Sequence, residues 1–239
     1  MMNIGPNKTV RDVALEIPGA TRVFETVGID YCCGGQRSLG DACATAGVTL
    51  EHVLTSLELT ETPRDGKPDF RTTTLAQLIE HILSAHHVFT RTEIARIRGL
   101  LAKVCTKHSE THLELAPLRT LFETLSSELE PHMFKEERIL FPYIIGLEDA
   151  VTNRRPLLRP PFGTVGNPIR MMMMEHDNAG HVLKEMRQLT FDYTPPPDAC
   201  MSYRALYQAM DEFEKDLHEH IHLENNILFP RAAELETAV

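Results

Sequence analysis

Several features that would point to common classes of protein are scarce in this chain. It has no tryptophan, and 24 lysines and arginines face 34 aspartates and glutamates, for a formal net charge of -10. Nucleic-acid binding needs a clustered basic surface, so this charge balance excludes nucleic acid as an expected partner. No apolar run approaches the roughly 18 residues that span a bilayer, so no membrane segment is expected.

The sequence also has neither the pattern of an export signal nor that of a disulfide framework. The first twenty residues have no long apolar stretch after a basic region, so they do not resemble a secretory signal. Five cysteines in 239 residues, with no such signal, indicate reduced thiols. We therefore expect a cytoplasmic protein.

The chain does contain an internal repeat. The segment that begins at His132 and ends in Ile-Leu-Phe-Pro recurs 88 residues later from His220, with His, Glu, Ile, Leu, Phe and Pro in register. One histidine precedes each copy at nearly the same distance, His87 before the first and His176 before the second. The repeating unit is therefore predicted to be a helical hairpin.

Each copy places a glutamate four residues after its histidine, Glu136 in the first and Glu224 in the second. This spacing puts both side chains on one helix face, with Cβ atoms about 6 Å apart. In the first copy the pair interrupts an apolar stripe formed by Leu125, Leu129, Ile139 and Leu140. The pair should point into a core, where an unpartnered carboxylate costs several kcal/mol. A metal cation between the helices is the simplest partner.

The wider pattern predicts an all-α protein. Amphipathic segments at about 74 to 101, 113 to 145, 169 to 190 and 199 to 231 indicate an up-down four-helix bundle over 74–235. Thr74 and Gln77 form a capping-box pattern at its start, and the proline in each Ile-Leu-Phe-Pro should limit or kink a helix end. Residues 149 to 168 should form a crossover loop, residues 1–60 a small helical domain, and residues 61–73 a linker.

The predicted metal ligands are four histidines and two glutamates: His87, His132, Glu136, His176, His220 and Glu224. This set suits two ions that each take two histidines and share both carboxylates. Mixed imidazole and carboxylate ligation favours iron, with manganese and zinc as alternatives. Two ferrous ions carry more charge than two carboxylates, which leaves room for an oxo or hydroxo bridge or a small diatomic ligand.

Some neighbouring positions stay open. The helical phase favours His87 over His86 by a small margin. Asp177 and His181 lie on the helix of His176 and could supplement or orient the ligands.

Two further predictions follow from the same helical phase. Glu137 is one position off the inward face and is predicted to be solvated, so its removal should not lower metal content. Met172 and Met173 are predicted to share the inward face with His176 and to fill the core.

The amino-terminal unit carries the sequence Asp30-Tyr-Cys32-Cys33-Gly-Gly35, with Cys43 further along the chain. Cys32 and Cys33 could be small buried residues before a turn, or an exposed dithiol that binds metal or exchanges electrons. Three thiols fall short of the four that usually hold an iron-sulfur cluster. A permanent cluster within one chain is therefore not expected.

With these motifs in place, the chain resembles the iron-sulfur cluster repair di-iron proteins, the family called repair of iron centres (the YtfE and ScdA type). The resemblance covers nearly the whole chain. It rests on Asp30-Tyr-Cys-Cys-Gly-Gly35, on Glu175-His176-Asp177, and on a hemerythrin-like bundle with His-x3-Glu before Ile-Leu-Phe-Pro. It implies the same six metal ligands and functional thiols at Cys32 and Cys33.

The resemblance implies that the protein helps restore iron-sulfur clusters damaged by nitrosative or oxidative stress in other proteins, by releasing iron. Delivery of this kind is not enzymatic turnover. Two alternatives stay open: the di-iron centre could bind nitric oxide or oxygen reversibly, or it could reduce nitric oxide or peroxide with electrons from the thiols. Whether the protein is a homodimer is not determined by the sequence.

Overall fold

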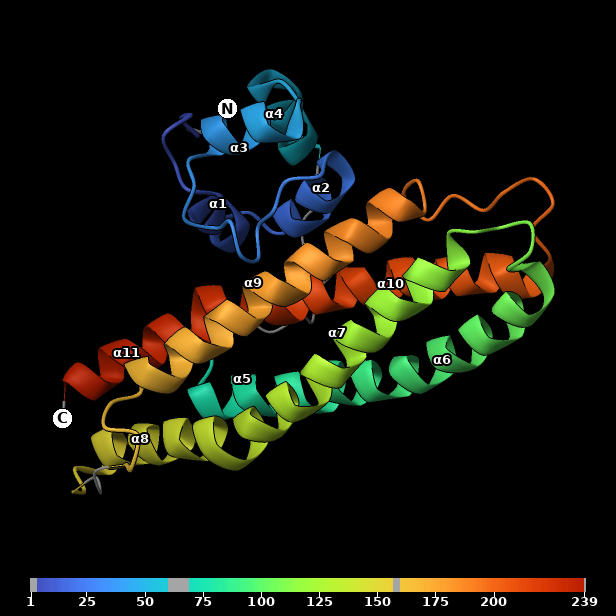
Figure 1. Cartoon of the computed structure of the whole chain (residues 1–239). Helices are drawn as coiled ribbons and strands as arrows, with labels where there is room; N and C mark the ends of the chain where they lie inside the picture. The colour runs from blue at the N-terminus through green and yellow to red at the C-terminus, as the bar shows by residue number, and fades with distance from the viewer. Residues whose placement is uncertain (1–3, 60–68, 157–159, 239) are drawn as a thin grey trace.

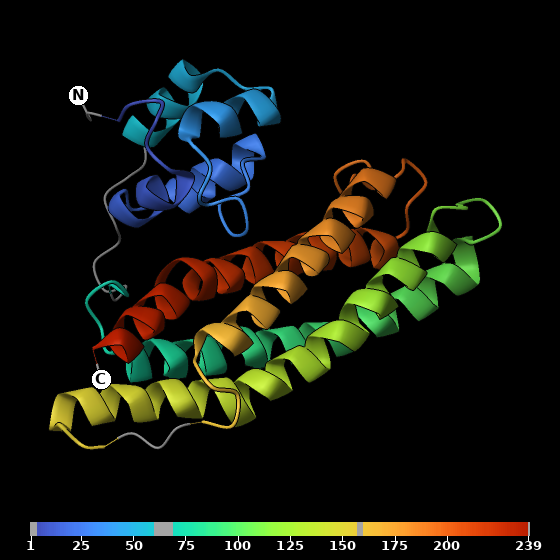
Figure 2. The same cartoon turned by 60° about the vertical axis from the view of Figure 1, so that its left-hand side comes forward.

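The computed structural model describes residues 4–59, 69–156 and 160–238. Within these residues every regular element is a helix, and the only bridge between extended residues joins Thr9 and Ser38. Figures 1 and 2 show two units, a long bundle and a smaller domain that lies against one of its sides. The prediction of an all-α fold with a small helical domain before a four-helix bundle is confirmed.

The small domain contains α1 (Val10–Glu16), α2 (Ala20–Val27), α3 (Leu39–Ala46) and α4 (Leu50–Glu58). Three of these helices begin at a hydroxyl residue, Thr9, Ser38 or Thr49, whose side chain accepts a hydrogen bond from a backbone N–H in the first turn. Such caps satisfy donors that a helix start leaves unpaired. The domain also has its own compact core, which includes Val13, Phe24 and Leu57.

The bundle begins with α5 (Leu75–His81), after a capping box between Thr74 and Gln77 that confirms the prediction there. Its long helices are α6 (Val88–His108), α7 (Leu115–Lys135), α9 (Gly166–Leu189) and α10 (Met201–Leu223), and shorter helices α8 (Phe141–Asn153) and α11 (Phe229–Thr237) extend two of them. Helix α6 packs on α7 and α10, and α7 packs on α9. Sequential helices run in opposite directions, as an up-down bundle requires.

Three π-helical turns interrupt the bundle helices, and each lies at a candidate ligand. They are η1 (Ile82–His87), η2 (Glu136–Leu140) and η3 (Glu224–Leu228). A π turn bonds residue i to i+5, so it inserts one extra residue and frequently marks a functional site. Pro142 and Pro230 are the second residues of α8 and α11, which follow η2 and η3, and both helices continue through them. The prediction that the helix ends near residue 145 is therefore wrong, because the wider turn accommodates the proline.

The extra residue also changes which side chains face the core. Ile139, predicted to be inward, is 48% exposed, whereas Leu140 and Phe141 are buried. Along α9 only Met172 of the methionine run is buried, and Met173 is exposed. The prediction that the methionine run fills the core is wrong except at Met172, since a helix at the edge of a bundle buries only a narrow stripe.

Two connecting segments lie partly outside the described residues. Residues 61–68 of the predicted linker 61–73 are not described, and neither are residues 157–159 of the predicted crossover loop 149–168. The described part of the linker is tied to the bundle, because Arg231 of α11 donates hydrogen bonds to the carbonyls of Phe70 (2.9 Å) and Thr73 (2.7 Å). No helix in the described parts of the chain is long and apolar enough to cross a membrane.

The small domain lies over α9, α10 and η3 (Figures 1 and 2). Glu25 of α2 accepts a hydrogen bond from Nδ1 of His218 on α10 at 2.7 Å, and the ring of Tyr31 packs on that of His222 at 5.4 Å. The guanidinium of Arg11 donates to the backbone carbonyl of Asn226 at 3.0 Å. These contacts hold the thiol-bearing loop of the domain against the bundle.

Candidate metal centre

Two groups of potential metal ligands lie side by side inside the bundle. The first contains His87, Glu136, His220 and Glu224, and the second contains His132, Glu136, His176 and Glu224. Within each group the ligand atoms lie within 4.8 Å of one another. All six residues are buried. The structure therefore brings together the six residues that the repeat predicts, with both glutamates shared between the groups.

The two carboxylates are oriented as bridges. Glu136 presents Oε1 to His132 Nε2 at 3.2 Å and Oε2 to His87 Nε2 at 3.5 Å. Glu224 presents Oε2 to His176 Nε2 at 3.1 Å and Oε1 to His220 Nε2 at 3.1 Å. Each carboxylate thus offers one oxygen to each group, which is the arrangement that two neighbouring cations can share.

Hydrogen bonds at Nδ1 fix the orientation of three of the four histidines. The acceptors are Glu137 for His87 at 2.8 Å, Glu175 for His132 at 2.7 Å and Asn225 for His176 at 2.9 Å. Since each acceptor is a side-chain oxygen, the network assigns the proton to Nδ1 and leaves the lone pair of Nε2 directed at the centre. Outer partners of this kind are typical of metal-binding histidines, and they raise the basicity of the ligand.

Glu137, Glu175 and Asn225 are functional positions that the sequence analysis missed or misread. Glu137 was expected to be solvated, yet its side chain is only 25% exposed and it contacts His87. Their signal in the sequence is position: Glu137 and Asn225 each follow a ligand glutamate by one residue, within a π turn. A strict period of 3.6 cannot reveal this, because it places position i+1 about 100° away from the ligand face.

His86 is buried beside the centre but belongs to neither group. Its Nδ1 hydrogen-bonds Asp216 at 3.0 Å, and its ring stacks on that of His220 at 5.6 Å. His220 Nδ1 is also buried and has no hydrogen-bond partner among the described residues. The geometry thus favours His87 as the ligand and places His86 behind His220.

Asp177 and His181 do not support the centre as expected. Both are exposed on α9, where His181 Nδ1 donates to the backbone carbonyl of Asp177 at 2.7 Å. They follow His176 by one and five residues, so helical rotation carries them about 100° and 140° away from it. The orienting carboxylate on this helix precedes the ligand instead, at Glu175.

The electrostatics of the centre call for cations. Burial and the charge of Glu224 act to raise the pKa of Glu136, but His132 and His87 outweigh them, and the pKa is lowered. Burial acts to lower the pKa of His132, and the charge of Glu136 with the hydrogen bonds of Glu136 and Glu175 raises it to about 10. Two buried carboxylates therefore stay ionised and need positive charge beside them.

Unsatisfied buried atoms supply the test of whether a metal fits. Both oxygens of Glu136, Oε2 of Glu224 and Nε2 of His87 have no hydrogen-bond partner among the described residues, although they lie near other polar atoms. Buried polar atoms are nearly always paired. These unpaired atoms lie around one point, so they indicate that a metal ion binds them there. Imidazole and carboxylate donors suit iron, manganese or zinc.

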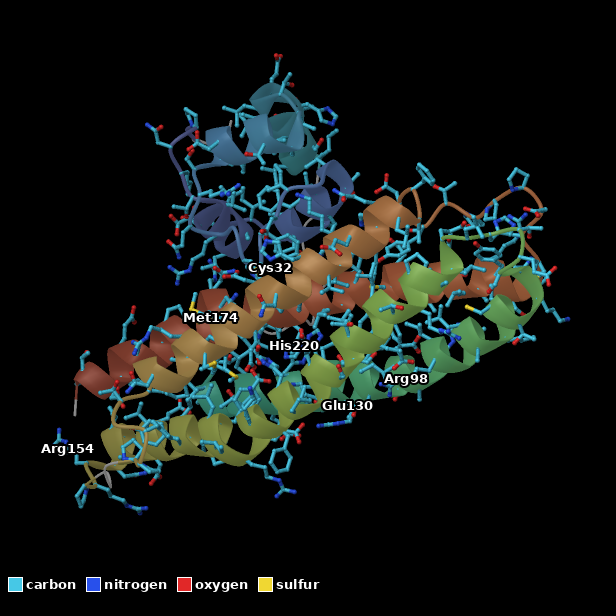
Figure 3. All side chains as sticks on the ribbon, in the orientation of Figure 1. Cys32, Arg98, Glu130, Arg154, Met174 and His220 are labelled. Atoms are coloured by element: carbon cyan, nitrogen blue, oxygen red, sulfur yellow. The ribbon has the colours of Figure 1, made fainter. Side chains whose placement is uncertain are left out.

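The thiol pair lies directly above this centre. Cys32 is 5% exposed and packs with the bundle core, so it is not the exposed thiol that one reading predicted, while Cys33 is half-buried. The carbonyl of Cys32 accepts a hydrogen bond from Asn225 Nδ2 at 3.3 Å. Figure 3 places Cys32 at the domain edge that faces the bundle, and His220 within the bundle below it. The hydrogen bond to Cys33, burial and the nearby Asp30 raise the pKa of the Cys32 thiol.

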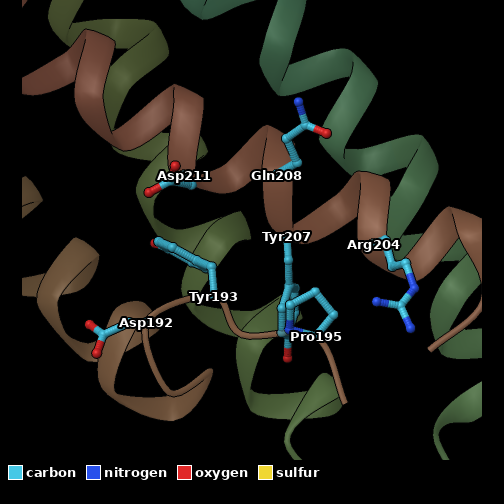
Figure 4. Close-up of a pocket in the computed structure, with 7 residues that line it drawn as sticks. All are labelled: Asp192, Tyr193, Pro195, Arg204, Tyr207, Gln208 and Asp211. Atoms are coloured by element: carbon cyan, nitrogen blue, oxygen red, sulfur yellow. The ribbon is translucent and has the colours of Figure 1, made fainter. Parts of the chain in front are cut away.

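A surface pocket of about 380 Å³ lies elsewhere, at the far end of the bundle (Figure 4). Its lining includes Tyr193, Arg204 and Tyr207. None of the candidate ligands lines it. This pocket is therefore separate from the candidate metal centre.

Comparisons with known proteins agree with this architecture. Residues 78–232 match the hemerythrin HHE cation binding domain, and residues 6–61 match a domain of unknown function, DUF542. The chain is 36% identical over 223 residues to a probable iron-sulfur cluster repair protein of Haemophilus influenzae, which covers 92% of this chain and 94% of that protein. It is 35% identical to the iron-sulfur cluster repair protein YtfE of an Escherichia coli strain, with the same coverage.

A comparable match, 36% identity over 92% of this chain and 94% of the relative, is found with YtfE of Citrobacter koseri. Both domains and nearly the full length are therefore shared with these relatives. The chain belongs to the iron-sulfur cluster repair protein family, with a hemerythrin HHE cation-binding domain as its carboxy-terminal part.

Proposed function

We propose that the protein is a di-iron protein that helps repair iron-sulfur clusters damaged by nitrosative or oxidative stress, and that it does so by donating iron. The observation that carries the proposal is the pair of bridging carboxylates, Glu136 and Glu224, each with one oxygen near each histidine pair. The names of the relatives supply the client class, proteins with damaged iron-sulfur clusters.

The ligand set is suited to an ion that can leave. Each iron would be held by two histidines and by one oxygen from each shared carboxylate, which leaves coordination positions open for an incoming ligand. The iron itself would supply Lewis acidity and exchangeable coordination sites. The protein's part is to direct the Nε2 lone pairs of His87, His132 and His176 at the centre, through hydrogen bonds from their Nδ1 atoms to Glu137, Glu175 and Asn225.

Iron transfer can be tested with purified components without oxygen. Iron-loaded protein is mixed with a dehydratase whose four-iron cluster has been damaged by nitric oxide, and both client activity and loss of iron from the donor are followed. We expect activity to return in step with iron loss. The variant Glu136→Ala should bind little iron and restore little activity, while Glu128→Ala, at an exposed position of α7, should behave as the wild type. If iron stays bound and the client stays inactive, the proposal fails.

Reversible binding of nitric oxide or oxygen is the second candidate, because the same open positions would accept a diatomic ligand. A saturable and reversible spectral change with either gas, without loss of iron, would favour it. Steady consumption of nitric oxide or peroxide with a reductant would instead favour an enzyme.

The setting of the protein follows from the same proposal. Five cysteines without disulfides and labile ferrous iron suit a reducing compartment, so we place the protein in the cytoplasm. The assembly to test is a homodimer, by sedimentation of the iron-loaded protein.

A further inference from the structure

A second group of metal-ligating side chains lies outside the bundle centre. Asp30, Cys32 and Cys33 each offer a ligand atom within 4.8 Å of the others, on the loop between α2 and α3. Both thiols are free. The loop faces the bundle, where a Cβ added at Gly180 would lie 3.9 Å from Cys33 Sγ. Gly180 is one helical turn beyond His176 on α9.

The spacing of these atoms matches a tetrahedral metal site. Cys32 Sγ lies 3.8 Å from Cys33 Sγ and 3.4 Å from Asp30 Oδ1. With metal bonds of about 2.3 Å to sulfur and about 2.0–2.2 Å to oxygen, a tetrahedron puts two sulfurs about 3.8 Å apart and a sulfur and an oxygen about 3.6 Å apart. The two distances from Cys32 Sγ are thus close to those of a bound site, and the three ligands leave a fourth position open.

The backbone of the loop keeps this arrangement in place. Asp30 Oδ1 accepts hydrogen bonds from the backbone N–H groups of Cys32 at 3.2 Å and of Cys33 at 2.9 Å. A Cβ at Gly34 would approach the carbonyl oxygen of Asp30 to 2.8 Å, and one at Gly35 would approach Asn226 Oδ1 to 2.7 Å. A side chain at Gly34 would therefore push on the backbone of the turn, and one at Gly35 would push on the contact with the bundle. The whole Asp-Tyr-Cys-Cys-Gly-Gly motif acts as one unit.

One side chain joins this loop to the bundle centre. Asn225 accepts a hydrogen bond from His176 Nδ1 through Oδ1 at 2.9 Å and donates one to the Cys32 carbonyl through Nδ2 at 3.3 Å. Asn226 donates a second hydrogen bond to the loop, from Nδ2 to the Tyr31 carbonyl at 3.0 Å. The thiol loop therefore lies above a candidate ligand, with one amide between them.

We propose that Asp30, Cys32 and Cys33 form a second metal site, with three protein ligands and one open position, that takes a thiophilic divalent cation such as ferrous iron. On binding, each thiol gives its proton to water and forms a sulfur–metal bond, and the carboxylate forms the third bond. No oxidation state changes, so no oxidant or reductant is needed. If iron donation is the function, which this step assumes, this site binds the iron as it leaves the bundle.

The site can be tested by titrating the iron-loaded, full-length, reduced protein with cobalt(II) without oxygen. Cobalt bound to thiolates has a charge-transfer absorption in the near ultraviolet that imidazole and carboxylate ligation lacks. We expect this absorption to saturate at one ion per chain and to disappear in Cys32→Ser and in Cys33→Ser. Asp30→Asn should weaken binding by at least about tenfold, because even partners behind a ligand are worth about 10–100-fold in affinity.

The control is Cys200→Ser, which removes a half-buried thiol at the start of α10 and should leave the titration unchanged. Absence of the thiolate absorption in the wild type, or its persistence after both Cys32 and Cys33 are replaced, overturns the site. Protection of Cys33 from alkylation by the bound ion gives a second readout that does not depend on the spectrum.

The role in iron transit has its own measurement. Iron release from the loaded protein to a chelator should slow at least severalfold in Cys33→Ser, while the amount of bound iron stays the same. Equal release rates in the variant and the wild type overturn the transit role. Failure of the wild type to restore a damaged client would instead count against iron donation itself, so the two failures are distinguishable.

Discussion

Two glutamates nine residues apart, Glu128 on α7 and Glu137 in the π turn η2 that follows it, have different surroundings. Glu128 is exposed, whereas Glu137 accepts hydrogen bonds from Nδ1 of His87 at 2.8 Å and from Arg91 at 2.7 Å. Glu137→Ala should lower the affinity for iron by about 10–100-fold, because His87 loses the partner that orients it. Competition with a ferrous chelator measures this. Glu128→Ala should match the wild type, and equal affinities for both variants would contradict the assignment.

Gly35 lies where the small domain meets the bundle, with no space for a side chain. A Cβ there would meet Asn226 Oδ1 at 2.7 Å and Arg11 Cβ at 3.3 Å. Gly35→Ala should therefore push the small domain off the bundle at a cost of about 1–3 kcal/mol. In a Cys33→Ser background, faster alkylation of Cys32 would report the opening. Gly5→Ala, in the same domain with nothing within 4 Å of the new Cβ, should not change the rate.

At the scale of helices, hydrophobic period and repeat suffice to predict the bundle and all six inward side chains. They fail at the π turns, because one inserted residue changes the phase: Ile139 moves to the surface and Glu137 moves toward His87. The burial of Cys32 could not be predicted either, since it depends on how two domains dock and not on local pattern. The positions that sequence patterns fail to predict therefore lie at or beside the candidate metal centre.

The two hairpins are equivalent in their ligands but not in what lies behind them. Glu137 and Asn225 occupy matching places after the ligand glutamates, and each accepts a hydrogen bond from the histidine of the preceding helix. Glu175 and His86 also match, yet Glu175 accepts a hydrogen bond from His132, whereas His86 stacks on the ring of His220 and hydrogen-bonds Asp216. The second hairpin thus has an amide, Asn225, where the first has a carboxylate, Glu137, and the thiol loop docks on that amide.

This difference between the hairpins predicts that one substitution should strengthen iron binding and weaken the docking of the thiol loop. Asn225→Asp gives His176 a carboxylate, as His87 has, so iron should be held about tenfold more tightly. The same change removes the Nδ2 donor and sets a carboxylate against the Cys32 carbonyl, so alkylation of Cys32 should become faster. Asn226→Asp is the matched control, because Asn226 contacts the loop but no candidate ligand of the bundle centre. It should speed alkylation without tightening iron; tighter iron in both variants would contradict this account.

At the scale of the whole molecule, the important variable is whether the small domain stays docked. One ion pair across that interface joins His218 on α10 to Glu25 on α2, at 2.7 Å. Glu214 and Asp30 also face His218. Burial acts to lower the pKa of His218, but the hydrogen bond and charge of Glu25 outweigh it and raise the pKa above the ordinary value.

Docking should therefore weaken as pH rises. The contact contributes fully below the ordinary histidine pKa of about 6.5 and is lost as pH rises through the raised pKa of the docked state. Alkylation of Cys32 measures docking, and Glu25→Gln serves as the reference at each pH because it keeps an acceptor for Tyr31 but lacks the charge. At low pH the alkylation rate of Cys32 should be about two- to fivefold lower in the wild type than in this variant, equivalent to about 0.5–1 kcal/mol. At high pH the two rates should be equal. A ratio that does not change with pH would mean that His218 does not control access to the thiols.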